Sequence, residues 1–229
     1  MQSSTGIMKR QVVIPAGRHA LSGTLSLPSN AAGVVVFAHG SGSARFSPRN
    51  QFVAGVLQAG GLATLLIDLL DVTEAEFREK VFDIELLAEP VQAAAGWLRR
   101  DPDSEQLQIG YFGASTGAAA ALVAAGRQPD AVAAVVSRGG RPDLAADTLP
   151  SVQAPTLLIV GGNDDVVITL NQEALNRLRC QKELVIIPGA THLFPEPRAL
   201  EEVARLAQCW FTRYLITNRS KIAGNRPHI

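Results

Sequence analysis

Cysteine is scarce in this chain: Cys180 and Cys209 are the two examples among 229 residues. Neither lies in a CxxC pair or in a cluster with histidine, which excludes a disulfide framework and a zinc site of the usual ligand spacing. We therefore expect two buried apolar thiols. An excess of charge of one sign is also lacking, because 21 Lys and Arg residues balance 21 Asp and Glu residues. This balance disfavours binding driven by counterion release from nucleic-acid phosphates.

Long hydrophobic runs are absent as well. Residues 1–10 lack the apolar core of a secretory signal peptide. No stretch approaches the roughly 18 consecutive apolar residues that indicate a membrane span. We therefore expect a soluble cytoplasmic protein whose partner is a small molecule rather than nucleic acid or a membrane.

The composition indicates a chain with a large core. Hydrophobic residues make up 47% of the sequence and charged residues 18%, which excludes a disordered chain. The length favours one domain, expected over residues 1–219. Residues 220–229 lack periodicity, and we expect them to form a flexible tail.

Two hydrophobic periods alternate along the chain. Continuous apolar runs, typical of strands covered on both faces, occupy residues 34–38, 63–67, 107–112, 131–136, 156–160 and 184–187. Residues 20–27 alternate and predict a half-exposed edge strand paired with residues 11–14. Helical stripes are formed by Ile84, Leu87, Val91, Ala94 and Leu98, by Leu200, Val203, Ala207, Phe211 and Tyr214, and, before the stop signal Gly60-Gly61, by Phe52, Val56 and Ala59.

This alternation predicts an α/β fold. Its central sheet should be mostly parallel, with helices on both faces and an antiparallel N-terminal edge. The connection over residues 137–155 is too short for a separate cap domain, so a site at this edge of the sheet should be open.

The sharpest motif is Gly113-Ala114-Ser115-Thr116-Gly117, which follows one apolar run and precedes an Ala-rich helix. A G-x-S-x-G sequence in this position predicts a serine on a strained turn between strand and helix, with glycines where side chains would crowd the turn. A chance match that merely ends a strand and caps a helix is the alternative. Ser115 is the candidate nucleophile.

A serine hydroxyl needs a neighbouring base, and His192 is the candidate among four histidines because it lies in the loop after the last strand. His19 and His228 read as solvated or turn residues, and His39, directly after a buried strand, should shape a loop. The loop after the preceding strand offers Asp164 and Asp165 as the acid that orients the base. Either carboxylate could instead cap the next helix.

Two backbone N–H groups are expected to form an oxyanion hole. One belongs to Thr116, after the nucleophile, and the other to Ser41 in the loop His39-Gly40-Ser41-Gly42-Ser43. A Gly- and Ser-rich loop of this kind could also be interpreted as a phosphate-binding loop. However, it lacks the spacing of a P-loop or a dinucleotide fingerprint, and no lysine follows it.

These motifs together resemble the α/β-hydrolase superfamily and, within it, the small, lidless dienelactone-hydrolase-like proteins, over about residues 20–217. The resemblance implies an α/β-hydrolase fold, and its D-x-x-V pattern favours Asp164, with Val167, over Asp165. Dienelactone hydrolases proper use a cysteine nucleophile, whereas this elbow carries Ser115, so ester hydrolysis is the safer inference. Residues 137–143 also look like hydrolase domains found fused to phosphoribosyltransferases.

The sequence thus predicts a serine hydrolase of the carboxylesterase type that forms an acyl-enzyme and needs no metal or cofactor. The alternatives are an acyltransferase with the same triad and a non-catalytic binding module on the same fold. Loop arginines, among them Arg45, Arg49, Arg138 and Arg141, could bind an anionic acyl group or could simply be solvated. Phe194, with Phe46, Leu69 and Leu70, could supply apolar walls or belong to the core. Arg45, Arg138 and Phe194 are the candidate substrate-binding residues.

Overall fold

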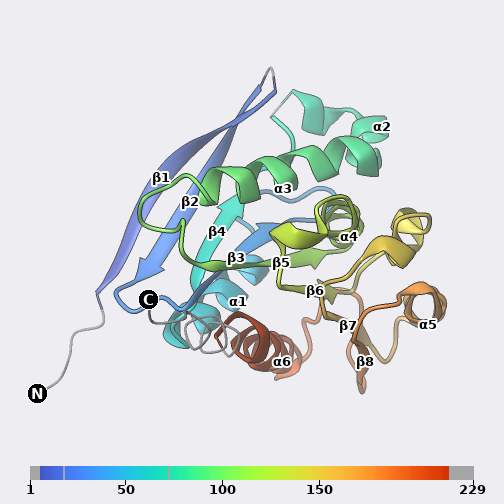
Figure 1. The fold of residues 1–229 in the computed structure, drawn as a ribbon. Coiled ribbons are helices and arrows are strands. Elements are labelled where there is room, and N and C mark those ends of the chain that lie inside the picture. Colours follow the sequence, from blue (N-terminus) through green and yellow to red (C-terminus); the bar gives the residue numbers. More distant parts are fainter. Residues whose placement is uncertain (1–5, 18, 72, 217–229) are drawn as a thin grey trace, which may run out of the picture.

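One mixed sheet runs through the computed structural model, which describes residues 6–17, 19–71 and 73–216 (Figure 1). In this part of the chain its eight strands lie in the order β1-β2-β4-β3-β5-β6-β7-β8. They are β1 (Ile7–Ala16), β2 (His19–Pro28), β3 (Gly33–Ala38), β4 (Ala63–Ile67), β5 (Gln108–Ala114), β6 (Ala134–Arg138), β7 (Thr156–Gly161) and β8 (Lys182–Ile187). The strands from β4 to β8 are parallel, while β1 and β2 form an antiparallel edge. The predicted sheet is confirmed.

Helices cover both faces of this sheet. They are α1 (Pro48–Ala59), α2 (Arg78–Val81), α3 (Ile84–Leu98), α4 (Thr116–Arg127), α5 (Asp165–Arg177) and α6 (Ala199–Phe211). Shorter helical turns are η1 (Glu74–Glu76), η2 (Pro129–Ala131), η3 (Pro142–Ala145), η4 (Leu149–Ser151) and the π-helical η5 (Thr212–Ile216). Figure 1 shows α3, α4 and α5 on one side of the sheet and α1 and α6 on the other. Each side buries its own apolar cluster.

The burial of the strands explains their sequence patterns. All six residues of β3 and all five of β4 are buried, as continuous apolar runs require between two helical layers. In β1, by contrast, Val12 and Ile14 are buried while Val13 is 67% exposed, because only one face of this edge strand meets the core.

Helix α1 corrects one prediction. It ends at Ala59, before Gly60-Gly61, as expected, and Gly61 has a φ of +79°. Its buried face, however, consists of Asn50, Val53, Ala54 and Leu57, and Phe52 is 41% exposed. The fully buried stripe is offset from the predicted one by about one position: Val53 and Leu57 are completely buried, whereas Val56 is only partly buried against the same cluster.

The cysteines correct a second prediction made from the sequence. Cys209 is exposed because it lies on the outer side of α6, whose inner stripe is formed by Val203, Ala207 and Trp210. Cys180 is half-buried, and burial raises the pKa of its thiol. The expectation of two buried thiols is therefore wrong.

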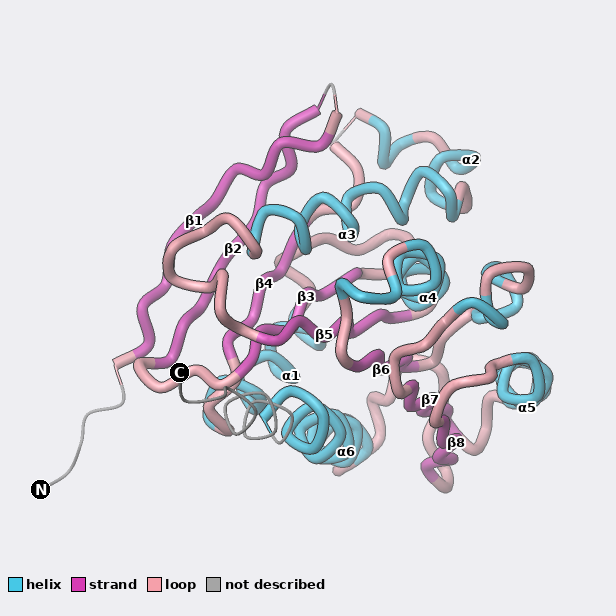
Figure 2. The backbone as a smooth tube through the Cα atoms, viewed as in Figure 1, coloured by secondary structure: helices cyan, strands magenta, loops and turns pink. Residues whose placement is uncertain are grey.

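The connection from β6 to β7 holds only η3 and η4 in the described chain, so no cap domain covers the sheet edge. Among the residues that the structure describes, none of the helices combines the length and the hydropathy that a membrane span requires. The expected tail, residues 220–229, lies outside the described residues. Figure 2 shows the loops at the carboxyl ends of β3 to β8, where the predicted site residues lie.

Candidate active site

Ser115 occupies a sharp turn between β5 and α4. Its φ of +52° and ψ of −122° lie in a region that costs energy for any residue with a side chain. A Cβ on Gly113 would lie 2.4 Å from Ala118 Cα, and one on Gly117 would lie 2.3 Å from the carbonyl oxygens of Ala38 and His39. Both glycines are therefore required by close backbone contacts. The predicted strand–turn–helix geometry is present.

The turn is hydrogen-bonded to the last residue of β6 and to the loop that follows it. Ser115 N–H donates to the carbonyl of Arg138 at 3.2 Å, and Ser115 O accepts from Arg141 N–H at 3.1 Å. The same loop passes close to His192: a Cβ on Gly139 would lie 3.1 Å from His192 O and 3.5 Å from its Nδ1 and Cε1. The 138–141 loop thus contacts both Ser115 and His192.

Asp164 and His192 meet directly. His192 Nδ1 lies 2.7 Å from Asp164 Oδ2, and the side chains are 38% and 17% exposed, respectively. A carboxylate only accepts hydrogen bonds, so Nδ1 carries the proton and the lone pair of neutral His192 is on Nε2. Asp165 is instead an exposed residue in the first turn of α5. Asp164 stands at the N-cap position of α5 but makes no capping hydrogen bond, because its carboxylate turns to His192.

The acid and histidine loops are joined through their backbones. Gly162 N–H donates to Ile187 O at 2.8 Å, and Asn163 N–H donates to Ala190 O at 2.9 Å. Gly161 permits this contact, since a Cβ there would lie 2.5 Å from Ala190 O. These bonds fix the relative positions of Asp164 and His192.

No hydrogen bond joins Ser115 Oγ to the His192 ring in the described part of the chain. Catalytic hydrogen bonds often form fully only when substrate binds, so a Ser115–His192 hydrogen bond is expected in the substrate complex. The 138–141 loop lies next to both residues.

The two expected oxyanion donors differ in whether the backbone N–H already has a hydrogen-bond acceptor. Thr116 is the first residue of α4, where a backbone N–H has no acceptor within the helix. Ser41 N–H donates to Thr116 Oγ1 at 3.0 Å. Gly40 brings this loop close, because a Cβ there would lie 3.0 Å from Ser115 Cβ. The Thr116 hydroxyl is a contact that the sequence analysis missed, although a hydroxyl residue directly after the nucleophile was a visible signal.

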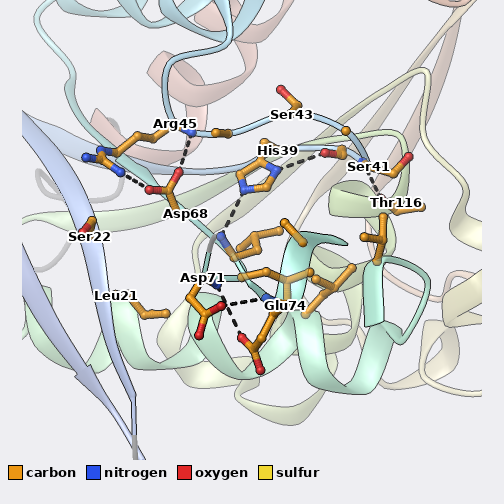
Figure 3. Close-up of a pocket in the computed structure, with 18 of the residues that line it drawn as sticks. Leu21, Ser22, His39, Ser41, Ser43, Arg45, Asp68, Asp71, Glu74 and Thr116 are labelled. Carbon is orange, nitrogen blue, oxygen red and sulfur yellow. Dashed lines mark hydrogen bonds and ion pairs between the residues drawn. The ribbon is translucent and has the colours of Figure 1, made fainter. Parts of the chain in front are cut away.

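His39 ties the loop after β3 to the end of β4, as Figure 3 shows. Its Nε2 accepts from Leu69 N–H at 3.0 Å, and its Nδ1 lies 3.0 Å from Gly40 O, to which it donates. Burial lowers the pKa of His39, so the ring is held neutral. Its predicted part in shaping the loop is confirmed.

A cavity of about 600 Å³ adjoins Ser41 and Thr116 on the side of the sheet covered by α3 (Figure 3). Its walls include Phe46, Leu69 and Leu70, and further lining residues are Leu21, Val81 and Leu87. Phe194 does not line it. That residue is 2% exposed, has a φ of +56° and belongs to the core under α1 and α6.

The loop arginines have different surroundings. Arg45 lines the cavity, donates to Asp68 through its backbone and side chain, and stacks on Phe46 with its Cζ 4.2 Å from the ring centroid. Arg138 is 7% exposed, with its Cζ 5.9 Å from the centroid of Phe194. Within the described residues, no group of three or more His, Cys, Asp or Glu side chains could hold a metal ion.

Comparisons with known proteins identify the family and confirm the fold. A model of the dienelactone hydrolase family matches residues 67–215. The crystal structure of a dienelactone hydrolase from Anabaena variabilis is 56% identical and superimposes with a TM-score of 0.89, covering 91% of this chain and 99% of that one. Est1E from Butyrivibrio proteoclasticus is 16% identical, with a TM-score of 0.75 over 89% of this chain and 98% of its own, and shares the fold.

A curated relative is a longer protein. A Mycobacterium tuberculosis protein provisionally named a phosphoribosyl transferase is 56% identical over 205 residues, which are 90% of this chain and 46% of that protein. The chain therefore spans about half the length of the curated relative it matches. The family match and the identity to the Anabaena structure together show that this chain belongs to the dienelactone hydrolase family, a family of hydrolases with the α/β-hydrolase fold.

Proposed function

We propose that this chain is a serine hydrolase of the carboxylesterase type, with Ser115 as nucleophile, His192 as general base and acid, and Asp164 as the residue that orients His192. The observation that carries the proposal is the 2.7 Å contact between His192 Nδ1 and Asp164 Oδ2, together with the strained turn at Ser115. The contact fixes the tautomer in which Nε2 can accept the serine proton. The proposed substrate is a small ester.

In the first step, Ser115 Oγ attacks the acyl carbon while His192 Nε2 takes its proton. The resulting imidazolium is stabilised by the Asp164 carboxylate and returns the proton to the leaving alcohol as the C–O bond breaks. Water then attacks the acyl-enzyme, giving its proton to His192, and Ser115 leaves with that proton when the acid is released. These two steps account for every atom and proton of ester hydrolysis, and no cofactor takes part in them.

The negative charge of each tetrahedral intermediate would be met by the Thr116 and Ser41 N–H groups. Thr116 is the first residue of α4, so its N–H could bind the oxyanion without first giving up a hydrogen bond inside the helix. Ser41 N–H already donates to Thr116 Oγ1, so it would have to share or exchange this bond for one to the oxyanion. The Thr116 hydroxyl would meanwhile keep the Ser41 amide beside Thr116.

The cavity next to these donors would hold an apolar part of the ester. A volume of about 600 Å³ falls in the range of small-molecule sites, and its apolar walls favour an alkyl or aryl group. Arg45 adds little net charge there because Asp68 neutralises it.

The test is labelling with a fluorophosphonate, together with turnover of short-chain esters. The protein should be labelled, and Ser115→Ala should lose labelling and lower turnover by a factor of about 10⁶. Ser151→Ala, which changes an exposed serine of η4 outside the site, is the matched control and should behave as the wild type. Turnover retained in Ser115→Ala with an unchanged circular dichroism spectrum would refute the nucleophile assignment.

A further inference from the structure

A second cavity adjoins the one proposed to hold the apolar part of the ester. It has a volume of about 450 Å³, and its lining residues come from β1, β2, β4, α1 and the loop before α1. Arg45 and Phe46, both in that loop, line the two cavities alike. These two residues therefore stand at the boundary between the cavities.

The strands show where this boundary runs. Side chains two positions apart on a strand share a face and are spaced by roughly 7 Å. On β2, Ser22 lines the first cavity and Thr24 the second, while at the end of β4 Asp68 lines the first and Leu66 the second. Leu66 is the register partner of Thr24, and Asp68 N–H donates to Ser22 O at 3.0 Å. The two cavities thus follow one another along the same pair of strands.

An ion pair crosses this boundary. Arg45 N–H donates to Asp68 Oδ1 at 2.8 Å, and the Arg45 guanidinium pairs with Asp68 Oδ2 (Figure 3). The side chains of the pair are 20% and 19% exposed, so water screens this pair less than one on the open surface. Arg45 Cζ also lies 4.2 Å from the centroid of the Phe46 ring. Two bonds to one carboxylate and a stacked ring hold the guanidinium in place.

The two cavities differ in chemistry. Leu69 and Leu70 give the first cavity apolar walls, whereas five lining residues of the second carry uncharged amides or hydroxyls, namely Gln11, Thr24, Ser26, Gln51 and Gln58. An alkyl chain gains about fourfold in affinity for each methylene that leaves water, and this gain ends where the chain meets the wall. Beyond the wall, Ala54 and Leu66 offer further apolar surface.

We propose that the Arg45–Asp68 ion pair, together with Phe46, is the end wall of the substrate cavity and sets the longest alkyl group that the site accepts. The proposal rests on the proposed function, because it names the size of the ester that the same cavity would hold. Arg45 acts here through its bulk, since Asp68 already meets its charge.

Binding of straight-chain primary alcohols, from butanol to dodecanol, tests the wall without turnover. In the wild-type protein the calorimetric affinity should rise about fourfold per methylene and then level off at one chain length. Arg45→Ala should move this limit to longer chains, so that an alcohol two carbons past the wild-type limit binds about tenfold tighter to the variant. Arg205→Ala, which removes an exposed, ion-paired arginine of α6 outside both cavities, is the control.

Two further variants separate bulk from charge and from folding. Arg45→Met loses the same charge as Arg45→Ala but keeps most of the side-chain length, so the limit should stay at its wild-type position. Phe46→Ala removes a 58% exposed ring from the wall and leaves the ion pair in place. It should fold even if Arg45→Ala does not, and it should move the limit by fewer carbons.

Turnover supplies the second arm. Esters are lengthened first in the acyl chain and then in the alcohol, and kcat/KM is measured for each series. The series whose chain enters the cavity should show the same limit as alcohol binding, and Arg45→Ala should shift that limit to the same extent.

The two arms separate the two proposals. A shifted limit for alcohol binding in Arg45→Ala, without any ester turnover, would support the wall and refute the esterase. Ester turnover with one and the same limit in the wild type, Arg45→Ala and Phe46→Ala would overturn the wall alone. An alcohol series without any limit in the wild-type protein would overturn it as well.

Discussion

The two ends of the site are built differently. At the β7–β8 end, residues 161–163 form backbone hydrogen bonds with residues 187–190. Glycine is required where these two segments meet. At the β4 end, the cavity wall includes η1 and α2, which bury none of their residues, and Phe77 and Phe82 are 49% and 44% exposed.

This part of the wall is held by short-range backbone hydrogen bonds within the segment itself, such as Val81 N–H to Phe77 O at 3.2 Å, and by exposed polar side chains. Glu74 accepts from Lys80 at 3.1 Å, and Asp71 accepts from Glu74 N–H at 2.7 Å. Exposed interactions of this kind contribute less than buried backbone contacts. The comparison teaches that the groups proposed for chemistry are fixed by the backbone, whereas one part of the cavity proposed for the substrate is carried by a thin surface segment.

The sharpest test of the backbone-fixed end compares two adjacent carboxylates. Asp164→Asn should lower kcat by about ten-thousandfold, because an amide cannot stabilise the imidazolium and favours the wrong tautomer. Asp165→Asn, on the exposed first turn of α5, should change kcat less than about twofold. Ester turnover at neutral pH gives both values, and equal effects of the two changes would contradict the assigned role of Asp164.

A smaller effect is expected where the two ends meet, at the Ser41–Thr116 contact. Thr116→Val keeps the side-chain shape but removes the acceptor for Ser41 N–H, and kcat should fall about tenfold with little change in KM. Thr116→Ser should restore kcat, since it restores the hydroxyl. If Val and Ser variants were equally impaired, packing rather than orientation of the Ser41 amide would explain the loss.

The smallest expected effect concerns His39, which links the Ser41 loop to Leu69 in the cavity wall. Because burial lowers the pKa of His39 in the folded protein, the unfolded chain binds its proton more readily, and stability falls as the pH drops below the unfolded value of about 6.5. His39→Gln should lose about 1 kcal/mol at pH near 7.5 and show a weaker loss on acidification. Urea unfolding at two pH values measures this, and an unchanged acid dependence would argue against the link.

Sequence reasoning predicted the sheet and the order of Ser115, Asp164 and His192, because buried strands and close backbone contacts restrict residue type strongly. Gly113 and Gly117 are the clearest cases, since any side chain there would overlap the backbone. The contact between Asp164 and His192 is present in the structure, while their catalytic roles remain predictions.

Other features left weaker signals. The face of α1 was misjudged because Phe52 and Val53 are both apolar and only tertiary packing decides which one is buried. Helix α2 is one turn long and has no apolar period to detect. Arg138 was a candidate for substrate binding, but its burial and lack of a counterion depend on packing against Phe194, 56 residues further along the chain.

The exposed segment over residues 73–82 has a consequence for evolution and engineering. It forms part of the cavity, yet its own residues are anchored by few buried groups. Insertions, deletions and recombination can therefore remodel it while the buried strands of the sheet stay intact. Family members that diverge in this segment would line the cavity differently while the contact between Asp164 and His192 stays unchanged.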